Sequence, residues 1–249
     1  MSGETTGWEP RAKVLGEVLA VVFGAYLFAS VVLAAVNPPL VDAGIVTPGG
    51  TDESLAQYTL QYGGFLLVIG WYVRAVRDEP LIPWARPGLR EIGLIIAGIV
   101  ALVGANNGIT WLFAAADVAI GDNTAVTVGA GDPGYLLTMV GFSLLVVGPA
   151  EELLFRGVVQ GRLRETWGVW PAIFLATVLF GLSHASVSGG IAGVVAYILT
   201  ATLLGVLLGY LYERTQNIVV PAVIHGVNNA VIFAWLYLGE IGVDRKSVV

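Results

Sequence analysis

The sequence predicts an all-α protein, a polytopic bundle of membrane-spanning helices. Its 249 residues have a mean hydropathy of +0.80, and 56% of them are hydrophobic whereas only 12% are charged. An ordinary soluble domain carries about 25% charged residues. Apolar stretches recur along the whole chain, each close to the roughly 20 residues that a helix needs to cross a bilayer. We therefore expect residues 1–249 to form a single membrane-embedded domain.

Seven stretches are apolar enough to be predicted as spans, and the segments between them are rich in proline, glycine, asparagine and aspartate. The first span follows a polar N-terminus and is too long for the apolar core of a signal peptide, so we expect it to be retained. Seven spans or eight, counting a further crossing, are both compatible with the pattern. The predicted spans are residues 13–36, 55–76, 91–116, 135–160, 169–185, 189–212 and 218–239.

Basic residues predict which ends of the spans face the cytoplasm, because cytoplasmic loops collect lysine and arginine. They lie before the first span, between the second and third, after the fourth and after the sixth. The alternate loops, 37–54, 117–134 and 185–189, contain none. We therefore expect a multi-pass cell-membrane protein with a cytoplasmic N-terminus. Arg245 and Lys246 are exceptions, since seven spans put them outside.

The composition excludes several kinds of function. There are no cysteines, which excludes a disulfide, a thiolate nucleophile and a cysteine-ligated metal. The net charge is −6, with acidic residues gathered in the loops, which is opposite to the charge of a nucleic-acid-binding surface. We expect the protein to lie in the lipid bilayer and not to bind nucleic acid.

Two adjacent glutamates, Glu151 and Glu152, interrupt the fourth predicted span, and Arg156 follows them. A charged side chain at the bilayer centre costs from about 2.5 to over 10 kcal/mol, and such residues face the interior of the bundle. Glu152 and Arg156 have the i,i+4 spacing, acid first, that favours an ion pair. Glu151 lies about 100° around the helix axis from Glu152. It has no such partner and is the better candidate for a functional carboxylate.

The two histidines of the chain lie in other apolar spans. His184 ends the fifth span, and His225 lies in the seventh with Asn229 one turn later. Measured from the turn near Gly168 at 1.5 Å per residue, Glu151 and His184 both lie at a depth of about 24 Å. The economical interpretation is that three spans bring their polar residues together.

These residues suffice for peptide hydrolysis, which needs an activated water, a proton shuttle and donors for a developing oxyanion. The set Glu151, His184 and His225 also has the composition of a catalytic zinc site, in which a water completes the coordination. From the residues alone, hydrolysis by a glutamate-activated water and hydrolysis that requires one divalent metal such as zinc both stay open.

Three short motifs, in this order and in separate spans, resemble those of the CPBP family. The family comprises the type II CAAX prenyl endopeptidases, bacteriocin-processing enzymes and related Abi proteins. Residues 151–156 match its EExxxR motif, 180–184 its FxxxH motif and 225–229 its HxxxN motif. The resemblance covers about 134–238, which would hold the catalytic helices, and the first three spans carry no motif.

What the resemblance implies is an intramembrane (metallo)endopeptidase that hydrolyses membrane-associated peptides, such as a prenylated CaaX peptide. By the family's pattern, Glu151 would be the general base and His184 its partner in activating water. The histidine and asparagine of the last motif would stabilise the oxyanion, and Arg156 would orient the acidic pair. The implied site residues are Glu151, Glu152, Arg156, His184, His225 and Asn229.

Two other classes of function could use the same residues. Intramembrane glutamate, histidine and arginine also form proton relays in transporters. Against a proton-coupled transporter, no inverted repeat is visible and the carboxylates cluster in one span. A non-catalytic immunity or scaffold protein could keep the same fold, although every polar motif position is filled here.

Four amide side chains in the second and third spans are also unusual for a membrane helix. They could line a substrate cavity or form hydrogen bonds between helices, and we favour the structural role. They are Gln57, Gln61, Asn106 and Asn107.

Overall fold

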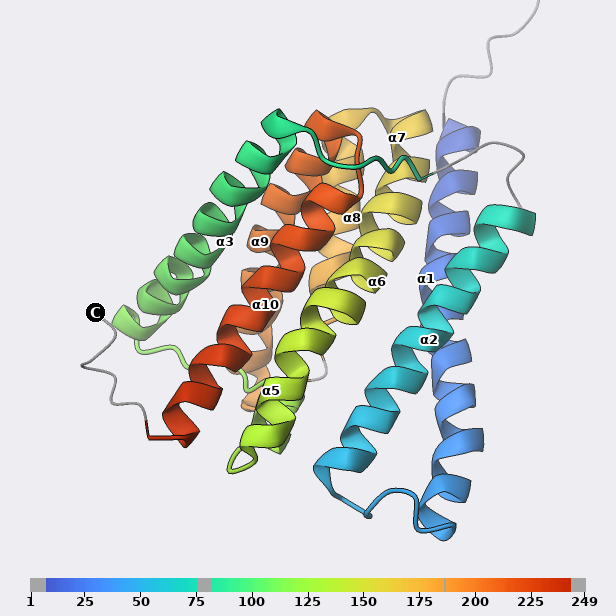
Figure 1. Cartoon of the computed structure of the whole chain (residues 1–249). Helices are drawn as coiled ribbons and strands as arrows, with labels where there is room; N and C mark the ends of the chain where they lie inside the picture. The colour runs from blue at the N-terminus through green and yellow to red at the C-terminus, as the bar shows by residue number, and fades with distance from the viewer. Residues whose placement is uncertain (1–7, 76–81, 186, 243–249) are drawn as a thin grey trace, which may run out of the picture.

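The computed structural model describes residues 8–75, 82–185 and 187–242, and it is a bundle of long helices (Figure 1). The predicted all-α fold class is confirmed. An antiparallel bridge between Asp122 and Ser188 joins two of the connecting loops. The helices are α1 (Trp8–Asp42), α2 (Thr51–Ala75), α3 (Leu89–Ala115), the short α4 (Thr124–Val128), the continuous helix Pro133–Trp167, α8 (Val169–Leu182), α9 (Gly190–Thr215) and α10 (Val219–Glu240).

Each of the seven predicted spans is helical, but not all of them are equally suited to the bilayer. Among the described residues, five helices are long and apolar enough to cross a membrane: α1, α3, Pro133–Trp167, α9 and α10. Helix α2 is not one of them, since its first half carries Asp52, Glu53 and two glutamines. Helix α8 is apolar but has only 14 residues. At 1.5 Å per residue it measures about 21 Å, against a hydrocarbon core of about 30 Å.

Helix α8 ends at Leu182, earlier than the predicted span 169–185. The side chains that follow capture the carbonyl group of Phe180. The Ser183 hydroxyl donates to it at 2.6 Å, and His184 Nδ1 lies 2.8 Å from it. Side chains that bond to the local backbone in this way compete with the helical hydrogen bonds. The same contact that ends the helix therefore orients the His184 ring.

The helix Pro133–Trp167 changes its winding around the two glutamates. It consists of α5 (Pro133–Phe142), a π-helical segment (Ser143–Val147), α6 (Gly148–Glu152), a second π-helical segment (Leu153–Gln160) and α7 (Gly161–Trp167). π-Helical turns are rare and occur frequently at functional sites. Here they flank the five-residue helix that carries both carboxylates.

Two glycines allow α6 and α10 to approach each other closely. A Cβ atom on Gly148 would lie 2.7 Å from the backbone nitrogen of Gly226 and 2.8 Å from the carbonyl oxygen of Ala222. A Cβ atom on Gly226 would lie 3.0 Å from the carbonyl oxygen of Ser143. Small residues at helix crossings in membranes permit this backbone approach. The crossing places His225, the neighbour of Gly226, beside the two glutamates.

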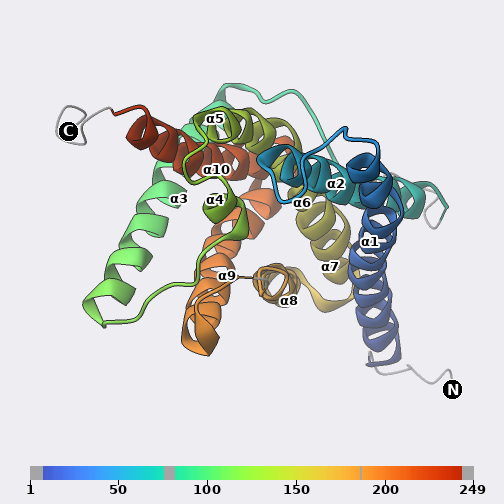
Figure 2. The ribbon, with the colours of Figure 1, turned by 90° about the horizontal axis from the view of Figure 1, so that it is seen from below.

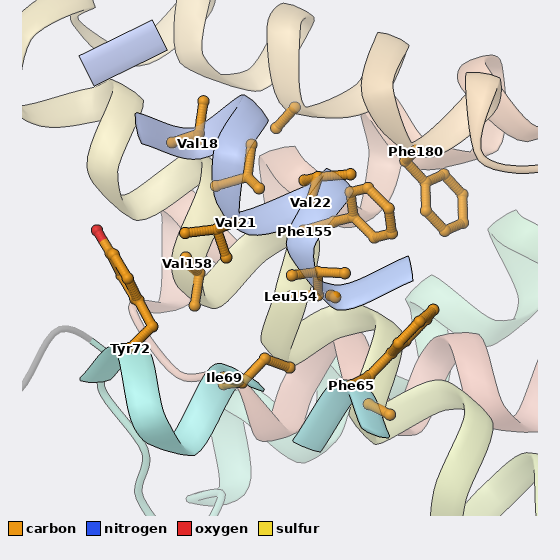
Figure 3. Packing of buried hydrophobic residues seen from close by; sticks show 14 of the residues in the cluster. Val18, Val21, Val22, Phe65, Ile69, Tyr72, Leu154, Phe155, Val158 and Phe180 are labelled. Atoms are coloured by element: carbon orange, nitrogen blue, oxygen red, sulfur yellow. The ribbon is translucent and has the colours of Figure 1, made fainter. Parts of the chain in front are cut away.

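The main hydrophobic cluster joins the motif-free helices α1 and α2 to the second π-helical segment and to α8 (Figure 3). Phe65 of α2 and Leu154, Phe155 and Val158 of the π-helical segment are fully buried. The rings of Phe155 and Phe180 make an edge contact at 5.2 Å. Packing on several sides therefore holds the helix turn that follows the glutamates.

Candidate active site

A cavity of about 790 Å³ lies where the three motif-bearing helices meet. Glu151, His184, His225 and Asn229 line it. Glu152 and Arg156 lie behind this wall and are fully buried. The structure thus brings all six sequence-predicted site residues into one place, from the helix Pro133–Trp167, from the end of α8 and from α10.

Glu151 has one carboxylate oxygen engaged and one free. The Tyr62 hydroxyl, from α2, donates to Glu151 Oε1 at 2.8 Å. Glu151 Oε2 is buried and has no hydrogen-bond partner among the described side chains. It lies 4.0 Å from Nε2 of His184 and 3.8 Å from Nε2 of His225. The free oxygen therefore faces both imidazoles across the cavity.

The surroundings of His184 determine which of its nitrogens carries the proton. Nδ1 lies 2.8 Å from the Phe180 carbonyl oxygen, which can only accept a hydrogen bond, so Nδ1 is the donor. In the neutral ring Nε2 is then an acceptor, and Nε2 is the nitrogen that faces Glu151. The Phe180 ring also contacts the imidazole at a centroid distance of 4.7 Å. The FxxxH spacing thus supplies both the carbonyl and the ring that hold His184.

Glu152 serves Arg156 and His225 together. Arg156 Nη1 donates to Glu152 Oε1 at 3.0 Å, and His225 Nδ1 lies 2.8 Å from the same oxygen. The side chains of Glu152 and Arg156 are 0% exposed. Such a pair is strongly destabilised when one partner is removed, because the other charge is then buried alone. The predicted ion pair is present, and it also fixes the His225 ring.

Arg156 is held on its other side by α9. Its Nη2 donates to the Gly205 carbonyl at 3.0 Å, and its guanidinium lies 4.5 Å from the centre of the Phe180 ring. One turn further along, Gln160 Nε2 donates to the Gly209 carbonyl at 3.0 Å. Gln160 is buried, and its position in the sequence, four residues after Arg156, was the signal that could have revealed it.

Asn229 is oriented by two neighbours on α10. Its Nδ2 lies 3.1 Å from His225 Nε2, and its Oδ1 accepts from Asn228 Nδ2 at 3.3 Å. Because His225 Nδ1 faces a carboxylate, the neutral ring presents Nε2 as an acceptor for the Asn229 amide. One proton of the Asn229 amide is then used by His225, and the second is available to the cavity.

Sequence reasoning missed Tyr62, which lies in a helix without a motif. It also favoured a structural role for four amides, whereas Gln57, Gln61 and Asn106 line the cavity. Asn107 instead donates to the carbonyl of Val103, one turn earlier in its own helix. Helical periodicity alone does not show which polar face of α2 or α3 meets the site.

The three predicted metal ligands, Glu151, His184 and His225, face one another but do not form a metal site. Within the described residues, no three histidine, aspartate and glutamate side chains are placed to hold a metal ion. His225 Nε2, one of the expected ligand atoms, is already engaged by Asn229. The donor set therefore does not fit a metal in this conformation.

Comparison with known proteins connects this site to a family. The sequence profile described as Type II CAAX prenyl endopeptidase Rce1-like matches residues 133–231. A protein of Bacillus subtilis (strain 168), named "Putative membrane peptidase YdiL", is 32% identical over 88 residues. That match covers 35% of this chain and 33% of the relative, so the chain spans about a third of the length of the curated relative. No solved structure matches the chain.

The resemblance to the CPBP family is confirmed. The segment that matches the family profile begins with the helix Pro133–Trp167 and ends within α10, so it holds all six site residues. Together with the five long apolar helices, the match indicates a multi-pass membrane protein whose residues 133–231 are similar to the CAAX-type proteases. Tyr62 is a contribution to this CPBP-type site from outside the matched segment.

Proposed function

We propose that this protein is an intramembrane endopeptidase in which Glu151 and His184 activate the attacking water. The observation that carries the proposal is the buried, unpartnered Glu151 Oε2, which lies 4.0 Å from His184 Nε2 at the wall of the cavity. Both atoms are hydrogen-bond acceptors when Glu151 is ionised and the His184 ring is neutral. A water between them donates one proton to each, which turns its oxygen lone pair towards a peptide carbonyl.

Hydrolysis then follows from the residues around this position. The water oxygen forms a bond to the carbonyl carbon while Glu151, with His184 as its partner, takes a water proton. The carbonyl oxygen becomes an oxyanion, for which the second amide proton of Asn229 is a donor. When both ring nitrogens of His225 carry protons, Nε2 becomes a second donor to the oxyanion and no longer accepts from Asn229. Transfer of the proton to the amide nitrogen breaks the C–N bond and releases an amine and a carboxylate.

The substrate of this reaction is a membrane-associated peptide. The direct test is the cleavage, by purified protein, of a panel that holds a farnesylated CaaX peptide and several leader peptides, with the products identified by mass spectrometry. Cleavage that requires Glu151 supports the proposal. Uptake of a solute into proteoliposomes under a pH gradient, lost on Glu151→Gln, would instead support a transporter. Full biological function of Glu151→Ala would support a non-catalytic scaffold or immunity protein.

The Tyr62 hydroxyl is predicted to position the general base. We expect Tyr62→Phe to lower kcat by about one to two orders of magnitude, because a hydrogen bond to a charged group contributes about 1.5–3 kcal/mol. KM should change little, since the bond is made to Glu151 and not to the substrate. Steady-state kinetics would check this. Tyr58→Phe, on the same helix and cavity wall, is the matched control and should keep its kcat.

Removal of metal ions is predicted to leave activity unchanged. The reason is that Glu151 and His184 suffice to activate water and that His225 Nε2 is already engaged by Asn229. Protein that has been treated exhaustively with a chelator, and shown to be metal-free by elemental mass spectrometry, should cleave the peptide at the original rate. Loss of activity that added zinc restores would show that a metal shares the site.

A further inference from the structure

Most of the residues that line the cavity lie in one half of the bundle. Successive long helices run in opposite directions (Figure 1). The C-terminal part of one helix and the N-terminal part of the next therefore lie at the same end of the bundle. Much of the lining comes from the second half of α1 and α3, the first half of α2 and of Pro133–Trp167, and the last turn of α8 with the loop behind it. Helices α9 and α10 line the cavity further, as far as Leu208 and His225, which lie beyond the middle of the bundle. Representative lining residues at this end are Leu33, Ser54, Thr110, Met139, Val187 and Phe233.

The described basic side chains outside the site lie at the other end of the bundle. We call this the basic end; it holds the starts of α1 and α3, α7, and the last turns of α2 and α9. The opposite end holds the loop residues 43–50, 116–132, 183–185 and 187–189, and Figure 2 views the molecule from that side. The residues that define the basic end are Arg11, Lys13, Arg74, Arg86, Arg90, Arg162, Arg164 and Arg214.

The cavity reaches the surface at the opposite end. Thr110, Asp122 and Thr124 line it and are exposed. Backbone hydrogen bonds hold this rim in place, because the Asp122 nitrogen donates to the Ser188 carbonyl at 3.0 Å and the Gly121 nitrogen donates to the Gly193 carbonyl at 3.0 Å. The rim is therefore a built part of the fold.

Towards the basic end, close packing fills the space next to the site. Leu154, Phe155, Val158 and Leu163 follow the glutamates and are 0% exposed. A Cβ atom on Gly157, between them, would lie 2.8 Å from the Ile82 side chain. None of these four residues lines the cavity. The site thus communicates with the end of the molecule that lacks the basic residues.

The charge distribution assigns this opening to one side of the membrane. The residues that line the cavity include no lysine or arginine. Cytoplasmic loops are enriched in both, so the basic end is the cytoplasmic end. Arg245 and Lys246, which follow α10 in the sequence, lie outside the described residues. Their two positive charges are fewer than the eight basic residues that define the basic end.

We infer that the active-site cavity opens to the extracytoplasmic face of the membrane. Its substrate, on the proposed endopeptidase function, is then a peptide that arrives from that face, either as a translocated segment or anchored in the outer leaflet. A lipid-modified C-terminus that is exposed only in the cytoplasm lies on the wrong side of the bilayer. The inference narrows the substrate class by location, which the three sequence motifs do not do.

The absence of cysteines from the chain allows a direct test of the side. Single cysteines are introduced at Ser54 and Gln61, which line the cavity, and at Ala85, which is exposed at the basic end. None of the three belongs to the catalytic machinery. Intact cells are treated with a membrane-impermeant maleimide before and after permeabilisation. We expect Ser54→Cys and Gln61→Cys to be labelled in intact cells and Ala85→Cys only after permeabilisation.

Labelling of the cavity positions only after permeabilisation, or of Ala85→Cys in intact cells, would overturn the inference. A variant that misfolds is recognised by a lowered unfolding temperature in detergent and is replaced by Thr110→Cys, which lies at the exposed rim. The labelling pattern does not require catalysis. If the protein cleaves no peptide but its cavity positions are labelled in intact cells, the proposed function is contradicted and the inferred orientation of the cavity is still supported.

Discussion

Replacing Glu151 with glutamine is expected to abolish measurable peptide hydrolysis while the bundle stays folded. Glutamine has nearly the same shape and keeps an acceptor for the Tyr62 hydroxyl, but its amide cannot take a proton from water. Positioned general-base catalysis contributes typically about 10²–10⁴-fold, and we expect kcat to fall within that range or below detection. The loss should appear in kcat more than in KM, since the carboxylate acts on the water.

The measurement is steady-state cleavage of one peptide by purified wild-type and variant protein, together with thermal unfolding in detergent. Equal unfolding temperatures would show that the variant is folded. Glu240→Gln is a suitable control, because Glu240 lies at the end of α10 and accepts only from the Gly131 backbone among the described contacts. Wild-type activity of the Glu151→Gln variant would exclude Glu151 as the base.

Replacing Arg156 with methionine is expected to destabilise the protein by about 3–5 kcal/mol, the cost typical of breaking a buried ion pair. Methionine fills much of the same volume but leaves Glu152 buried without its counter-charge. It also removes the hydrogen bond to the Gly205 carbonyl and the contact with the Phe180 ring. Thermal or denaturant unfolding in detergent, followed by helical circular dichroism, would measure the loss.

An ion pair at the surface supplies the matched control. Arg164 bonds to Glu213 at 2.8 Å, and its side chain is 46% exposed. Arg164→Met should cost only about 0–1 kcal/mol. The double variant Glu152→Gln with Arg156→Met removes both charges and should be more stable than the sum of the single changes predicts. Strict additivity would contradict the coupling that we assign to the buried pair.

Much of the site could be predicted from the sequence because membrane burial makes polar residues conspicuous. Glu151, Glu152 and Arg156 were evident as charges in an apolar stretch, and helical spacing paired Glu152 with Arg156. His184 and His225 were evident as the two histidines of the chain. Charged and polar side chains are unfavourable in contact with lipid, so they face the interior of the bundle and pair with one another. Their convergence could therefore be expected on energetic grounds.

The contact of Tyr62 with Glu151 could not be predicted in the same way. Tyrosine is common at membrane interfaces, and nothing local distinguishes a tyrosine that reaches Glu151 from one that faces lipid. The engagement of His225 Nε2 by Asn229, which bears on the metal question, also depends on ring orientation. Orientation is set by Glu152 on a neighbouring helix and not by spacing along α10.

The sequence by itself determined the all-α membrane fold, the order of the helices, the six candidate site residues and the end of the bundle that carries the positive charge. Those features depend on composition, on helical periodicity and on the high cost of charge in lipid. Only the tertiary structure decided which oxygen of Glu151 is free, that α8 is short, and towards which end the cavity opens. Those features depend on contacts between helices, such as the crossing at Gly148 and Gly226. The packing of the whole bundle sets the geometry of these contacts.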